Sequence, residues 1–255
     1  MSDSIRVEIA GRHATVTLAR PPLNILDLET LAALEEGLAE LAARSDVQLV
    51  VVRGEGGKAF SAGVSIHDHT PDKIDRMLLG FHGALGRLRA LDALTVAAVD
   101  GHCLGGGMEL ACCCDLVVAS ERSRFGQPEI QLGCFPPVAA ALLPRRIGAA
   151  ATLELLLSGR TLGATEALSL GLVSRVVADG QVEGEIERIA EWLLAKSAVA
   201  TRIIKRAVRA GEERPFPAAL KEAERLYLRD LAASADMREG IEAFLAKRPA
   251  EWKHR

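Results

Sequence analysis

The stretch that decides the fold runs from Gly101 to Gln131 and reads GHCLGGGMELACCCDLVVASERSRFGQPEIQ. Three consecutive glycines, Gly105 to Gly107, stand at the start of an apolar segment that predicts a helix. Glycines place no side chain between the backbone and a ligand, and the first N–H groups of a helix have no intrahelical acceptor. A helix start of this kind stabilises a developing negative oxygen. We therefore expect an anion-stabilising backbone site here.

Two glutamates accompany the glycines in otherwise uncharged surroundings. Glu109 follows Gly106 by one helical turn, which places its carboxylate on the same side as the Gly106 N–H. Glu129 follows Pro128, whose ring restricts the backbone. Isolated glycines often only permit a turn, and a glutamate near a helix start is often a cap. The two glutamates with the glycines favour a catalytic site, because burial raises a carboxyl pKa toward neutrality.

Hydrophobic periodicity predicts alternating strands and helices in the rest of the chain. We expect strands over 5–10, 14–18, 49–52, 95–99 and 116–119, and helices over 28–41, 74–88, 150–157, 182–196, 198–211, 217–233 and 236–247. This order predicts an α/β fold that ends in helices only. We expect residues 1–197 to form the core with the active site and residues 198–255 to form a helical oligomerisation region.

Composition argues against several classes of protein. Hydrophobic residues make up 49% and charged residues 25% of the 255, so a sizeable core can be buried. Lys and Arg total 31 against 34 Asp and Glu, a net charge of −3, which argues against nucleic acid as a partner. We find no membrane-length apolar run and no signal-peptide core, and expect a cytoplasmic protein with no membrane partner. The five cysteines, three of them adjacent, predict buried apolar residues and no disulfide framework.

Two histidines form an H-x-H pattern at His67 and His69. Such a pair can ligate a metal from a strand, but no third ligand stands nearby in the sequence. We therefore expect no metal site. A substrate-facing role for His67 or His69 stays open.

The pattern G-x-x-x-G-G-G-x-E-L-A, followed by F-G-Q-P-E-I, resembles the crotonase superfamily, the enoyl-CoA hydratases and isomerases, and the similarity runs through nearly all of the chain. The resemblance implies a crotonase-like spiral of ββα units with a C-terminal helical region. It also implies an acyl-CoA thioester as substrate, no separate cofactor, and a homotrimer or a dimer of trimers. For Lys247 and Arg248, contact with a neighbour's CoA phosphates and simple solvent exposure both stay open.

The same resemblance implies roles for individual residues. The family pattern A-G-x-D supplies one oxyanion N–H from the residue after the glycine, which is Val64 here, paired with Gly106. Ser65 replaces the aspartate. Hydratases of the family keep both glutamates, whereas isomerases usually keep only the one at the Glu129 position, so the presence of Glu109 favours a hydratase. We expect the substrate-binding pocket to be lined by Ala62, Gly63, Ile66, Gly105, Pro136 and Pro137.

Two segments depart from the common enoyl-CoA hydratases. Residues 65–72, SIHDHTPD, and residues 134–140, CFPPVAA in place of a glycine-rich turn, resemble the cyclohexa-1,5-diene-1-carbonyl-CoA hydratases. A bulkier apolar turn beside Glu129 favours a compact planar ring over a flexible chain. The alternatives are a general short-chain enoyl-CoA hydratase or isomerase, acting in fatty acid rather than aromatic compound degradation, and a non-catalytic CoA-thioester-binding member.

Overall fold

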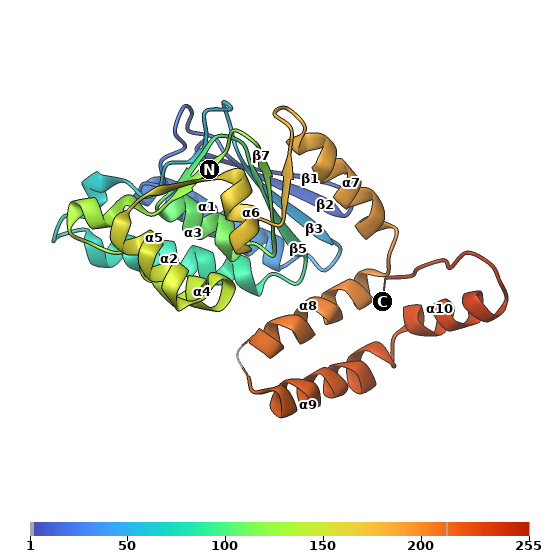
Figure 1. Ribbon diagram of the computed structural model, residues 1–255. Helices are drawn as coiled ribbons and strands as arrows, with labels where there is room; N and C mark the ends of the chain where they lie inside the picture. Colours follow the sequence, from blue (N-terminus) through green and yellow to red (C-terminus); the bar gives the residue numbers. More distant parts are fainter. Residues whose placement is uncertain (1–2, 213, 255) are drawn as a thin grey trace.

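The computed structural model describes residues 3–212 and 214–254, and its core is a sheet of six strands in the order β1-β2-β3-β5-β7-β10 (Figure 1). The first two strands, both predicted, form an antiparallel hairpin, and the others run parallel to β2. Their bounds are β1 Ile5–Ala10, β2 His13–Leu18, β3 Leu49–Gly54, β5 Leu94–Val99, β7 Leu116–Ser120 and β10 Arg175–Val177.

A second, smaller sheet has the order β4-β6-β8-β9. Its strands are short: β4 Ala59–Ser61, β6 His102–Leu104, β8 Arg124–Gly126 and β9 Thr161–Gly163. Three times in succession the chain adds a strand to the large sheet, then one to the small sheet, and then forms a helix. This repeat is the spiral of ββα units that the family resemblance implies.

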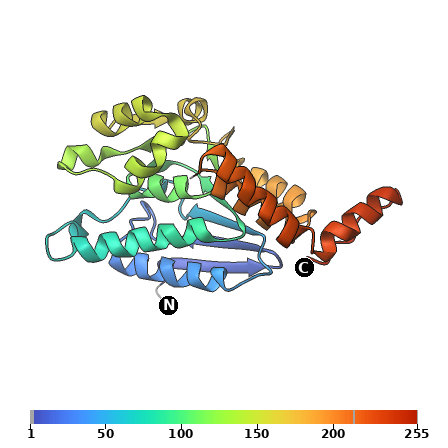
Figure 2. The same ribbon diagram turned by 90° about the horizontal axis from the view of Figure 1, so that it is seen from below.

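Helices cover both faces of the large sheet. The helices before the C-terminal region are α1 Leu28–Ala42, α2 Ile74–Ala90, α3 Gly106–Cys113, α4 Pro137–Ile147, α5 Ala149–Ser158, α6 Ala164–Leu170 and α7 Val182–Leu194. Asp27 is the N-cap of α1, because its side chain accepts a hydrogen bond from the Thr30 N–H. Figure 2 shows α1 and α2 side by side beneath the sheet, where the Arg87 Nε donates to the Glu35 carboxylate at 2.6 Å.

The apolar run in β3 is explained by burial on both sides of the sheet. Val50 and Val52 pack into the main core with α1 and α2, whereas Leu49 and Val51 pack with Ile189 and its neighbours on α7. A strand that is buried on both faces carries apolar residues at every position, so apolar and polar residues do not alternate along it. The prediction of a buried strand at 49–52 is therefore confirmed.

The C-terminal helices lead away from the sheets (Figure 1). They are α8 Ala198–Glu212, α9 Phe216–Leu226 and α10 Ala235–Leu245. Buried ion pairs join α8 to the core, because Lys205 and Arg209 each lie 2.7 Å from the Asp115 carboxylate. The end of the chain returns to the core, where Trp252 Nε1 donates to the Ala195 carbonyl at 2.9 Å.

The helix predicted over 217–233 is present over 216–231, but its last turn differs from the prediction. Helix α9 ends at Leu226 and is continued without a break by a π-helical turn, Tyr227–Leu231. There the Ala232 N–H donates to the Tyr227 carbonyl at 2.8 Å. Neither glycine nor proline marks this widening, so hydrophobic spacing alone does not reveal it. Whether residues 198–255 act as an oligomerisation region stays a prediction. In the described part of the chain, no helix has the length and apolar character needed to cross a membrane.

Candidate functional site

The backbone N–H groups of Val64 and Gly106 lie on facing segments. The Leu26 N–H donates to the Gly63 carbonyl and the Ser65 N–H donates to the Leu26 carbonyl, both at 3.0 Å. In a parallel bridge of this kind, the N–H of the residue between them, Val64, points away from Leu26. Gly106 lies beside Val64, since a Cβ added to Gly106 would stand 3.3 Å from the Val64 nitrogen.

Gly106 is the first residue of α3, so its N–H has no intrahelical acceptor. A Cβ added to Gly63 would stand 3.3 Å from the Gly106 nitrogen, which explains why small residues are needed on both segments. Gly105 is held just before the helix by its N–H, which donates to the Gly126 carbonyl at 2.9 Å. The two predicted oxyanion donors are therefore neighbours. Their convergence on one oxygen stays a prediction.

The Glu109 carboxyl group is buried one turn into α3, with 4% of the residue exposed. Its Oε1 accepts a hydrogen bond of 2.8 Å from the N–H of Ala139, in the first turn of α4. Burial raises the pKa of Glu109 to about 7, the charge of Glu129 adds to the rise, and the N–H groups of Ala139 and Val138 oppose it. A carboxyl group with this pKa can both donate and accept a proton at neutral pH.

Glu129 lies on a 3₁₀ helix, Pro128–Leu132, that ends at Gly133 in the left-handed conformation. Its carboxylate faces the glycines, because a Cβ added to Gly105 would stand 2.8 Å from Glu129 Oε1. Burial raises the pKa of Glu129, and the charge of His69 opposes the rise. Both glutamates therefore have raised pKa values and border the same glycine segment.

Gln127 is a site residue that the sequence analysis missed. Its side chain is buried and, with the amide nitrogen turned toward Glu129, it donates to both carboxylate oxygens at 3.1 Å. These bonds orient the Glu129 carboxylate. The sequence offered no specific signal for it, because polar side chains are frequent in residues 120–131.

One cavity of about 500 Å³ brings the predicted residues together. Its walls include every residue predicted for catalysis, the oxyanion site or substrate contact: Ala62, Gly63, Val64, Ile66, Gly105, Gly106, Glu109, Glu129, Pro136 and Pro137. The sequence analysis did not single out the apolar wall from α2, formed by Ile74, Met77, Leu78 and Phe81. A largely apolar cavity with a few polar groups suits an acyl group and a reacting double bond.

The loop after Val64 brings one of the two histidines to this cavity. His69 lines it, whereas His67 is exposed and is not among the lining residues that the structure describes. His69 Nδ1 donates to the Ser65 carbonyl at 2.9 Å, which leaves Nε2 for other partners. The neighbouring Asp68 is buried and accepts a bond of 3.2 Å from the Leu28 N–H at the start of α1. The loop is therefore tied to α1 by Asp68.

The segment after Glu129 borders both carboxylates. Phe135, Pro136 and Pro137 line the cavity, and Pro137 begins α4. The N–H groups that hold Glu109 come from the first turn of this helix. The sequence analysis places the segment beside Glu129, and the structure adds that it also supports Glu109.

The cysteines fit the prediction of buried apolar residues with one exception. Cys103 and Cys112 to Cys114 are buried, and burial raises the pKa of each thiol. Cys134 is half-buried and lines the cavity, where its Sγ lies 3.4 Å from the Glu129 carbonyl. Among the residues that the structure describes, no group of three or more His, Cys, Asp or Glu side chains is arranged to hold a metal ion.

Comparison with known proteins decides the family. The family model described as enoyl-CoA hydratase/isomerase matches residues 8–255. The chain belongs to this family. A cyclohexa-1,5-dienecarbonyl-CoA hydratase of Thauera aromatica is 36% identical over 249 residues, which cover 98% of this chain and 96% of that protein. A short-chain-enoyl-CoA hydratase of Clostridium acetobutylicum is 32% identical over 98% of this chain and 97% of its own.

Solved structures of the enoyl-CoA hydratase/isomerase family show the same fold. The crystal structure of an enoyl-CoA hydratase from Bacillus anthracis superposes with a TM-score of 0.94 at 28% identity, over 99% of this chain and all of that one. The resemblance to the crotonase superfamily and the predicted fold class are confirmed.

Proposed function

We propose that this enoyl-CoA hydratase/isomerase family member is a hydratase that adds water to the conjugated double bond of an acyl-CoA thioester. The observation that supports this most is the pair of glutamates with raised pKa values in one cavity with the neighbouring N–H groups of Val64 and Gly106. Addition of water to such a double bond places negative charge on the thioester oxygen. Each backbone donor to such an oxygen contributes about 2.7–4 kcal/mol to transition-state stabilisation.

The chemistry requires two proton transfers. As the water oxygen bonds to the β-carbon of the acyl group, one carboxylate accepts the water proton and the electron pair of the double bond moves toward the thioester oxygen. A proton from the second carboxyl group then reaches the conjugated system and restores a neutral thioester. Glu109 and Glu129 share these tasks, and Gln127 orients Glu129. Atoms balance without a redox cofactor, so we propose that none is needed.

The acyl group that we propose is a cyclic conjugated dienoyl group, as in cyclohexa-1,5-diene-1-carbonyl-CoA. The stiff wall of Phe135, Pro136 and Pro137 beside both carboxylates supports a compact planar ring. The Thauera relative bears a matching name. The Clostridium relative supports the alternative, a general short-chain enoyl-CoA hydratase. An isomerase or a non-catalytic thioester-binding protein is disfavoured by the presence of both glutamates.

The assembly that we propose is a homotrimer or a dimer of trimers, formed through the C-terminal helices. Large apolar side chains on these helices are exposed, among them Phe216 and Phe244 at 77% and 83%. Exposed apolar surface of this kind marks an interaction site. We further propose a cytoplasmic location, where acyl-CoA thioesters are metabolised, as the sequence analysis expects.

The decisive experiment measures hydration by ultraviolet absorbance and product mass. We expect a higher kcat/KM for cyclohexa-1,5-diene-1-carbonyl-CoA than for crotonyl-CoA. Glu109→Gln and Glu129→Gln should each lower kcat about 100-fold or more, because each removes a general acid–base group. Both variants should still bind CoA thioesters.

Three results would contradict parts of this proposal. Near-normal turnover in both glutamine variants would remove the proposed mechanism. A higher kcat/KM for crotonyl-CoA would favour the general short-chain hydratase. Tight thioester binding without any hydration would favour the non-catalytic alternative.

A further inference from the structure

A second cavity, of about 560 Å³, adjoins the candidate active site. The two cavities share His82 and Pro137 as lining residues. The second is also lined by Cys113, which lies one helical turn beyond Glu109 on α3, and by Val138 in the first turn of α4. The cavities therefore meet beside Glu109.

Position relative to the catalytic groups assigns this space to the acyl group. The thioester oxygen is expected at Val64 and Gly106, and the reacting carbons at the two glutamates. The second cavity adjoins the first beside Glu109, where the reacting carbons are expected, so atoms of the acyl group beyond these carbons have space to enter it.

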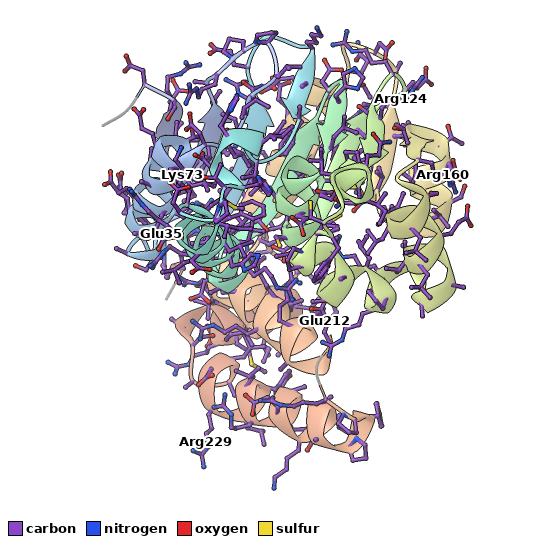
Figure 3. The ribbon with its side chains drawn as sticks, turned by 90° about the vertical axis from the view of Figure 1, so that its left-hand side faces the viewer. Glu35, Lys73, Arg124, Arg160, Glu212 and Arg229 are labelled. Atoms are coloured by element: carbon purple, nitrogen blue, oxygen red, sulfur yellow. The ribbon has the colours of Figure 1, made fainter. Side chains whose placement is uncertain are left out.

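The second cavity carries an excess of positive charge. Three arginines line it, Arg89 from α2 with Arg145 and Arg146 from α4, against one carboxylate, Glu212. The formal balance of these four side chains is 3 − 1 = +2. Glu212 stands at the end of α8, where the C-terminal helices meet the core (Figure 3). Apolar side chains, including Leu85 and Leu142, form the rest of the wall.

Two buried polar atoms in this wall lack a partner. Among the residues that the structure describes, His82 Nε2 and Arg89 Nη1 are buried side-chain atoms without a hydrogen bond. The Arg89 Nη2 lies 3.4 Å from the Glu212 carboxylate, and the Arg146 Nη2 donates to the Cys114 carbonyl at 3.0 Å. Both unpartnered atoms are closed off from the cavity by their neighbours, so neither can bond to a ligand there. The charge that a ligand meets is that of the lining arginine side chains, and a guanidinium group pairs best with a negatively charged oxygen.

We propose that this cavity binds a carboxylate carried by the acyl group on the side of the ring away from the thioester. The proposal rests on the proposed function and narrows its substrate class to a cyclic acyl group with an acidic substituent. The ring occupies the apolar space beside the glutamates. Arg89 from α2 and Arg145 from α4 supply the positive charge that binds the carboxylate.

The test uses aromatic thioesters that cannot be hydrated in this way, so binding is measured without turnover. Calorimetric titration of the full-length protein compares benzoyl-CoA with its 3-carboxy and 4-carboxy derivatives, and with the neutral 4-carbamoyl derivative. At least one carboxy derivative should bind about tenfold or more tightly than benzoyl-CoA, because charge-assisted bonds to arginine are strong. The carbamoyl derivative should show little of this gain.

Single substitutions show which arginine is responsible for the tighter binding of the carboxy derivative. Arg89→Met should bring the affinity ratio between the carboxy derivative and benzoyl-CoA close to one. Arg87→Met is the matched control, because Arg87 lies on the same helix but pairs with Glu35 outside the cavity, and it should keep the wild-type ratio. If Arg89→Met does not fold, Arg145→Met should still reduce the ratio, since Arg145 is an exposed lining residue.

The outcomes separate this inference from the function on which it rests. If benzoyl-CoA binds but neither carboxy derivative binds more tightly than the carbamoyl derivative, the inference is overturned and the hydratase proposal stands. If no aromatic thioester binds, the cyclic acyl proposal fails together with the inference. Inorganic phosphate that binds at Arg89 without any preference for a carboxy thioester would assign the cavity to a free anion and overturn the inference.

Discussion

The Glu109 carboxyl group is buried, and this burial raises its pKa from an ordinary 4.5 to about 7. At a pH between these two pKa values, Glu109 has lost its proton in the unfolded chain but keeps it in the folded protein. The folded protein is therefore most stable below pH 4.5, and its stability falls as the pH rises from 4.5 to about 7. The loss amounts to about 3 kcal/mol, since one pKa unit corresponds to about 1.4 kcal/mol.

Glu109→Gln should remove this pH dependence. The amide oxygen can still accept the bond from the Ala139 N–H, but no charge has to be buried. The quantity to compare is the free energy of unfolding of the variant minus that of the wild type. This difference should be about 3 kcal/mol larger at pH 8 than at pH 4.5. Urea unfolding at both pH values and at fixed protein concentration measures the difference. An unchanged pH dependence would show that Glu109 does not carry the raised pKa.

His69 acts on the second carboxylate, because its charge lowers the pKa of Glu129 against the effect of burial. His69→Asn retains a donor for the Ser65 carbonyl in place of Nδ1 but removes Nε2 and the charge. The pKa of Glu129 should then rise. Where ionised Glu129 is required, the acid limb of kcat/KM against pH should move to higher pH.

The matched control for this prediction is His67→Asn, because His67 is exposed on the same loop. It should leave the acid limb in place. Profiles of kcat/KM between pH 5 and 9 make the comparison. Equal shifts in both variants would mean that the loop, and not the His69 charge, controls the profile.

At the scale of secondary structure, the start of α3 depends on Gly105. Its φ of +52° is unfavourable for side chains, and a Cβ there would stand 2.8 Å from Glu129 Oε1. Gly105→Ala should displace the Glu129 carboxylate and lower kcat about 100-fold, the cost of a displacement of about 1 Å in a catalytic group. Steady-state kinetics measure this loss.

Gly83→Ala is the control for this substitution. Gly83 lies inside α2, and a Cβ added there meets no atom within 4 Å. Alanine in place of glycine inside a helix stabilises by about 0.5–1 kcal/mol. This variant should therefore keep full activity and unfold at a higher urea concentration. Full activity in Gly105→Ala would contradict the role of the close approach.

At the scale of the whole molecule, the C-terminal helices and the π-helical turn between them expose several large apolar side chains. Phe216, Leu228 and Phe244 are 77%, 69% and 83% exposed. We expect light scattering to show a trimer or a dimer of trimers at micromolar concentration. Phe244→Glu should shift the mass toward the monomer, because a buried carboxylate without a partner is unfavourable. Unchanged circular dichroism would show that the helices remain, and a monomeric wild type would contradict the assembly.

The sequence by itself determined the elements and the main catalytic candidates, because their signals are local. The cap at Asp27 and the leucine spacing after it specify α1 within a few residues. Gly106 and Glu109 lie one turn apart, so helical geometry alone places them on one side. A local signal fails where nothing in the spacing changes, as at the π-helical turn Tyr227–Leu231.

Only the tertiary structure decided what surrounds these residues. The Ala139 N–H that binds Glu109 lies 30 positions away, and the spiral brings α3 and α4 together. The amide of Gln127 and the cavity behind Glu109 likewise depend on how side chains from separate turns of the spiral pack. Local propensity carries no information about such contacts, because burial and hydrogen bonding between distant segments arise only when the chain has closed on itself.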